Sequence, residues 1–134
     1  MISKRILHSD LTAAALTQTL DFDKWFGGQG LPAKSRVLGA AIELAVPFSG
    51  GGATTVTVDI GVTGDPDAVI AGSNVFAAAV VGQASTLPRG TAPNIATSDP
   101  KIRVSSDVNV VDLNAGDMTV RLFVVGDIDA SGPF

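Results

Sequence analysis

The amino-acid sequence predicts an all-β protein: an antiparallel β-sandwich or jelly roll of about seven or eight short strands with one short helix. Short runs in which apolar and polar residues alternate have the period of two that half-buried strands show. Fifteen glycines and seven prolines supply turns between these runs. Apolar residues make up 46% of the chain but aromatic residues only 5%, so the core is expected to be aliphatic. Two facing sheets, each burying one alternating face, fit this pattern better than an up-and-down barrel.

The clearest strands are residues 36–46 and 55–62. In the second, threonines and Asp59 alternate with valines and an isoleucine, and many of these residues are β-branched. Residues 50–52 are three consecutive glycines, which break the chain between the two runs. We therefore predict a hairpin of two antiparallel strands joined by this loop, with one face buried and one in water.

The remaining predicted strands are residues 2–7, 16–22, 75–81, 102–106, 109–113 and 118–125, the last of them central. Residues 114–117, Asn-Ala-Gly-Asp, predict a turn. Residues 87–100 contain three prolines and predict a long surface loop.

Residues 64–72 predict the one short helix. Asp65 is placed to cap the first turn, Pro66 suits the first helical position, and Asp67 suits the positive end of the helix dipole. Gly72 then supplies a left-handed stop.

The length of 134 residues predicts one domain over 1–134, with an N-terminal arm of about residues 1–10 and a short C-terminal tail of about 127–134. The net charge is −4 and no cluster of lysine and arginine occurs, which argues against a nucleic-acid partner. No apolar run reaches the roughly 18 residues that a membrane-spanning helix needs, and the first ten residues lack an apolar stretch long enough for a signal peptide, so none is expected there. The absence of cysteine excludes disulfides and thiolate chemistry.

The residue types that carry catalysis do not form a recognisable set. His8 is the single histidine and lies beside two cations near the start of the chain, where a surface role is favoured over that of a general base. Zinc favours nitrogen and sulfur ligands that the chain lacks. The pairs Asp65/Asp67 and Asp127/Asp129 offer oxygen ligands for calcium, but neither has the spacing of an EF-hand loop, so capping and a solvated tail are favoured instead. We therefore expect a non-enzymatic protein without a cofactor or metal.

From Ser9 to about Gly82 the sequence resembles small virion structural proteins of tailed phages. The resemblance lies in residues 9–15 (Ser-Asp-Leu-Thr-Ala-Ala-Ala), in the strand entry at residues 32–38 and in the Phe-Ser-Gly-Gly-Gly of residues 48–52. It continues through the Thr-Val strand to residues 60–68, Ile-Gly-Val-Thr-Gly-Asp-Pro-Asp-Ala. It covers a little over half of the chain and implies a jelly roll or related sandwich that is repeated in many copies on a particle.

Within that class the expectation is a capsid decoration (cement) protein, which is made in the host cytoplasm and becomes part of the virion. Its expected partner is the major capsid protein, and a homotrimer is expected by analogy. An N-terminal arm with Lys4, Arg5 and Ile6 is the expected capsid contact.

A second expected contact is the loop that carries Leu87, Arg89 and Asn94. The alternative function is a tail, neck or adhesion component that binds a protein or a glycan, through this loop or through Trp25 and Phe26.

Overall fold

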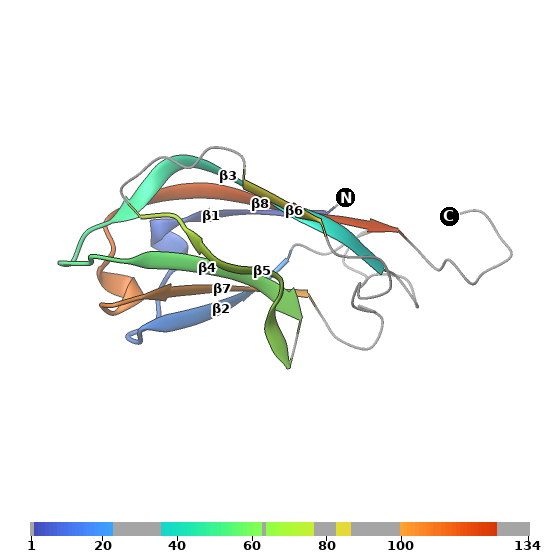
Figure 1. Ribbon diagram of the computed structural model, residues 1–134. Coiled ribbons are helices and arrows are strands. Elements are labelled where there is room, and N and C mark those ends of the chain that lie inside the picture. Colours follow the sequence, from blue (N-terminus) through green and yellow to red (C-terminus); the bar gives the residue numbers. More distant parts are fainter. Residues whose placement is uncertain (1, 23–35, 63, 77–82, 87–99, 126–134) are drawn as a thin grey trace, which may run out of the picture.

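A computed structural model describes residues 2–22, 36–62, 64–76, 83–86 and 100–125 (Figure 1). Within them the chain forms eight strands and two 3₁₀ helices. In chain order these are β1 (Ile2–Leu7), η1 (His8–Asp10), β2 (Thr17–Asp21), β3 (Arg36–Ser49), β4 (Val56–Val62), β5 (Asp65–Asn74), β6 (Gln83–Thr86), β7 (Pro100–Ser106), η2 (Val110–Asp112) and β8 (Ala115–Val125).

The strands form two four-stranded antiparallel sheets that face each other (Figure 1). Sheet A has the order β1-β8-β3-β6, and sheet B has the order β2-β7-β4-β5. The predicted all-β antiparallel sandwich is therefore confirmed. The pairs are nested, because β1 pairs with β8, β2 with β7, β3 with β6 and β4 with β5. Two further pairs, β3 with β8 and β4 with β7, join these four strand pairs into two sheets.

Alternation along the strands builds the core between the sheets. In β8, Met118, Val120 and Leu122 are completely buried, and the residues between them lie on the outer face. In β4, Val56, Val58 and Ile60 are completely buried as well. The central position of β8, between β1 and β3, agrees with the prediction.

The predicted hairpin of residues 36–62 is wrong in its pairing, although both of its strands exist. β3 belongs to sheet A and β4 to sheet B, so the glycine loop between them connects the two layers. Gly50, Gly51 and Gly52 all have positive φ angles, a conformation that other residues adopt only at a cost. Alternation shows which side chains of a strand point into the core. It does not show which of the two sheets the strand belongs to, because both sheets turn their apolar face toward the same core.

The predicted helix of residues 64–72 is also wrong, because β5 occupies this segment. Gly64, with φ +90°, makes the turn out of β4, and Pro66 lies near the start of an edge strand, where its missing N–H is tolerated. Val69 and Ile70 are buried against the core. Gly72, with φ +62°, lies inside β5, between two pairs whose register differs by one residue, and accommodates a bulge there. Asp65, Pro66 and Asp67 therefore have no helix to cap.

The segment between β7 and β8 differs from prediction too. Residues 109–113 were expected to be a strand, but η2 is a single 3₁₀ turn in which Val110 is buried. Residues 114–117 were expected to be a turn, but Ala115 already begins β8. Phe48 explains why Gly116 stands there: a Cβ on Gly116 would lie 2.2 Å from the Phe48 ring, which is completely buried.

The other predicted strands agree with the structure where it describes them. β1 matches residues 2–7, β2 lies within 16–22, and β7 contains 102–106. Of the strand expected at 75–81, the structure describes Val75 and Phe76, and Phe76 forms an isolated bridge with Phe48. The tail expected at 127–134 lies outside the described residues.

Candidate functional site

The three residues expected on an N-terminal capsid-binding arm belong to β1, so residues 2–7 are part of sheet A rather than an arm outside it, and the capsid contact stays a prediction. β1 pairs with β8 along its whole length. Ile6 is completely buried, and Arg5 donates two hydrogen bonds to Asp117, from Nε at 3.1 Å and from Nη2 at 2.9 Å. Lys4 is half-buried and lies opposite Val120, on the inward side of this edge strand. A charge on that side discourages pairing with another strand.

Asp65 and Asp67 lie side by side at the start of β5. A side-chain hydrogen bond with Asp67 raises the pKa of Asp65 above its usual value, and desolvation and the adjacent negative charge add to the shift. Within the described residues no three side chains of the metal-binding types are grouped together, and no helix is long and apolar enough to cross a membrane. The expected contact loop with Leu87, Arg89 and Asn94 lies outside the described residues, as do Trp25, Phe26, Asp127 and Asp129.

Three connections that the structure describes in full lie at one end of the sandwich, and hydrogen bonds join the third of them to each of the other two. We call this end the closed end and define it as residues 8–16, 50–55 and 107–114, which join β1 to β2, β3 to β4 and β7 to β8. It lies at the left of Figure 1, at the end of the sandwich that carries η1, η2 and the glycine loop.

Backbone hydrogen bonds tie the first connection to the third. The N–H of Val110 donates to Ala15 O at 2.8 Å, and just before the third connection the N–H of Ser106, the last residue of β7, donates to Leu16 O at 2.8 Å. The N–H of Val111 donates to Ala13 O at 3.2 Å. These bonds hold the two segments beside each other beyond the end of the β2–β7 pair.

Asp107 ties the second connection to the third. Its carboxylate accepts the N–H of Thr54 at 2.9 Å and of Thr55 at 3.2 Å, and also the Thr54 hydroxyl. These bonds, the Thr54 hydroxyl first, lower the pKa of Asp107 to about 2. Gly51 packs so closely here that a Cβ would lie 2.8 Å from the backbone oxygen of Asp112.

The surface of the closed end is apolar and acidic. Leu16 and Val111 are 52% and 44% exposed, and Ala14 and Ala15 beside Leu16 are exposed too. The three connections contain Asp10, Asp107 and Asp112, all exposed, and no lysine or arginine.

Sequence reasoning missed this surface. Leu16 and Val111 both fell in predicted strands, where an apolar residue is expected to point inward. The adjacent pair Val110-Val111 was the available signal, because neighbouring residues of a half-buried strand cannot both point into the core.

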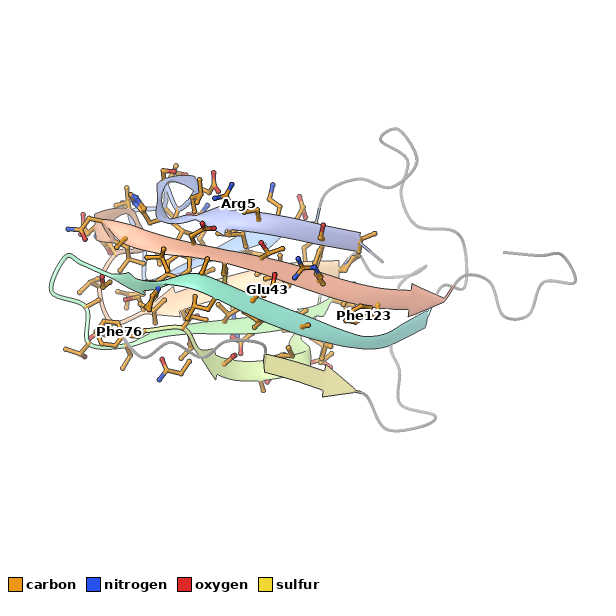
Figure 2. The ribbon with its side chains drawn as sticks, turned by 90° about the horizontal axis from the view of Figure 1, so that it is seen from above. Arg5, Glu43, Phe76 and Phe123 are labelled. Atoms are coloured by element: carbon orange, nitrogen blue, oxygen red, sulfur yellow. The ribbon has the colours of Figure 1, made fainter. Side chains whose placement is uncertain are left out.

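The outer faces of the two sheets, which we call the walls, differ from the closed end, because ion pairs join side chains on neighbouring strands there. On sheet A, seen in Figure 2, Arg121 Nη1 lies 2.6 Å from Glu43 Oε2, in addition to the Arg5–Asp117 pair. Phe123 of sheet A is 40% exposed, and in Figure 2 it lies near one end of the sandwich, with Phe76 near the other.

On sheet B, Lys101 pairs with Asp21, and Arg103 pairs with Asp59. Asp59 is only 7% exposed although it lies on the outer side of β4, because the bulge of β5 at Gly72 lies beside it. The Gly72 N–H donates to Asp59 Oδ1 at 2.7 Å. The Asp59 carboxylate therefore links three strands, because it belongs to β4 and binds Arg103 of β7 and the Gly72 N–H of the β5 bulge.

No family model, curated protein or solved structure matches the chain.

Proposed function

We propose that the chain is a non-enzymatic structural protein of a tailed-phage virion, a decoration protein that binds the outside of the capsid and stabilises the shell. Its partner in this proposal is the major capsid protein, and it acts as a homotrimer. The sequence resemblance over residues 9–82 supports the class of protein.

The observation that carries the proposal is the nesting of the strand pairs. Folding one long antiparallel hairpin over on itself pairs the first strand with the last, the second with the seventh, the third with the sixth and the fourth with the fifth. The described pairs have this order, and we propose on that basis that the sandwich is a jelly roll, as the resemblance implies. Jelly rolls also occur in unrelated proteins, so the function itself requires a direct test.

Two further features favour a structural role. Ion pairs between neighbouring strands, such as Arg5–Asp117 and Arg121–Glu43, neutralise opposite charges along the walls. The closed end is held by backbone and carboxylate hydrogen bonds, so a partner meets a surface that is already ordered. Many copies of such a module, each with a modest interface, together stabilise a shell.

The test is to measure the mass of the purified protein by light scattering and then mix it with capsids that lack it. We expect a trimer that occupies regular positions in electron micrographs and makes the particles more resistant to heat and osmotic shock. A protein that leaves the capsids undecorated would refute the proposal. Binding to tail or neck structures or to glycans would then identify the alternative role.

A further inference from the structure

We propose that the closed end is the surface with which the protein docks on its partner, and that the partner's contact patch has an apolar centre and a basic rim. This inference rests on the proposed function, in which the partner is the capsid shell, and it names the surface that makes the contact.

Leu16 and Val111 are exposed at a place where hydrogen bonds hold the backbone. Leu16 lies beside Ala15, whose carbonyl accepts a hydrogen bond from Val110, and Val111 follows Val110 directly. The hydrogen bonds of both segments are made before any partner arrives. Docking therefore removes apolar surface from water with little further ordering of the chain.

The negative charge of the closed end indicates a partner surface that carries positive charge. Of the nine lysines and arginines in the sequence, none falls in the three connections of the closed end, whereas Asp10, Asp107 and Asp112 do. Asp107 stays ionised at neutral pH because its hydrogen bonds to Thr54 and Thr55 favour the carboxylate. Lysine and arginine side chains around an apolar centre are the complementary surface, and their attraction also speeds the encounter.

A second copy of the same chain fits this surface less well. A symmetric contact between two closed ends would bring together the same exposed carboxylates, Asp10 and Asp112 among them, and like charges across an interface oppose association. The walls are also less suited, because four ion pairs, Arg121–Glu43 among them, already join opposite charges there.

The test compares three forms of the full chain for binding to capsids that lack the protein. The docking variant replaces both exposed residues, Leu16→Asn and Val111→Thr. The control replaces an exposed apolar residue of sheet A, Phe123→Thr. Circular dichroism establishes that the three forms have the same fold, and light scattering gives the mass of each one alone.

We expect the docking variant to bind at least about tenfold more weakly than the unmodified protein, because it no longer buries two apolar side chains on docking, with the control unchanged. An additional Asp112→Asn variant should bind more weakly at low salt and lose part of the salt dependence.

Three outcomes would overturn the assignment. If the docking variant decorates capsids as well as the unmodified protein, the closed end is not the contact, while the proposed function stands. If the unmodified protein itself leaves capsids bare, the proposed function fails together with this assignment. If the docking variant loses self-association in solution, the occupant of the closed end is a second copy of the chain.

Discussion

The ion pair between Asp59 and Arg103 should contribute much more to stability than the exposed pairs on the walls. Arg103 donates to Asp59 Oδ2 from Nε at 2.9 Å and from Nη2 at 2.8 Å, and the Gly72 N–H donates to Oδ1 at 2.7 Å. The Asp59 side chain is 10% exposed and that of Arg103 36%. Asp59→Ala removes all three bonds at once and leaves the guanidinium and the Gly72 N–H without this partner.

The size of the effect follows from this geometry. Removing one member of a fully buried ion pair costs about 3–5 kcal/mol, whereas an exposed pair contributes about 0–1 kcal/mol. Arg103 is partly exposed, so water hydrates it once Asp59 is gone, and we expect a loss of about 2–3 kcal/mol for Asp59→Ala. Arg103→Ala should cost at least as much, because it leaves the more deeply buried carboxylate without its cation.

The assay is urea unfolding followed by far-ultraviolet circular dichroism, on both single variants and on the double variant. We expect a coupling energy above about 1 kcal/mol. The matched control is the same cycle on Arg121 and Glu43, whose side chains are 32% and 58% exposed, with an expected coupling of about 0.2–1 kcal/mol. Equal coupling in the two cycles would refute the view that burial by the β5 bulge strengthens the pair.

Three further predictions use the same unfolding assay. Gly61→Ala should destabilise the protein by about 3 kcal/mol or more, because its Cβ would lie 2.2 Å from the carbonyl oxygen of Asp65. Gly52→Ala meets no atom within 4 Å and should cost only about 1–2 kcal/mol for its φ of +82°. A Gly61 variant as stable as the parent would show that β5 does not press on β4 at this point. Ser73→Ala should raise the stability by about 1 kcal/mol, since the Ser73 Oγ is buried and has no hydrogen-bond partner among the described residues; a loss of stability would indicate that the hydroxyl is hydrogen-bonded. The pKa of Asp107 is about 2, below the usual value of about 3.9, so its contribution is complete above roughly pH 5 and is lost as the pH falls toward 2. Asp107→Asn should therefore be less stable than the parent at neutral pH, with the difference in unfolding midpoint shrinking between pH 5 and pH 2; a difference independent of pH would contradict this.

Much of the strand content was predictable from the sequence because alternation is a local property. Residues 56–62 and 118–125 point every second side chain to one face whatever else the chain does, and the structure buries Val58, Ile60 and Val120 as expected. Most of the turns that end these strands could also be recognised locally, from glycine and proline.

Pairing and burial across the sheets depended on residues far apart in the chain. Asp65, Pro66 and Gly72 carry the local signals of a helix, yet the segment pairs with the free edge of β4 as β5, because strand pairing and core burial outweigh the stability of one short helix. Asp59 is buried on an outer face only because the β5 bulge lies beside it. Leu16 and Val111 are exposed because they lie in the connections beyond the last residue pair of β2 and β7 and not in the sheet. The sequence by itself thus determined the all-β class and most of the strands with a clear alternation, because alternation is local. The tertiary structure decided that residues 65–74 are a strand and residues 110–112 a 3₁₀ turn, which strands meet and which apolar side chains stay exposed, since those depend on contacts between distant segments.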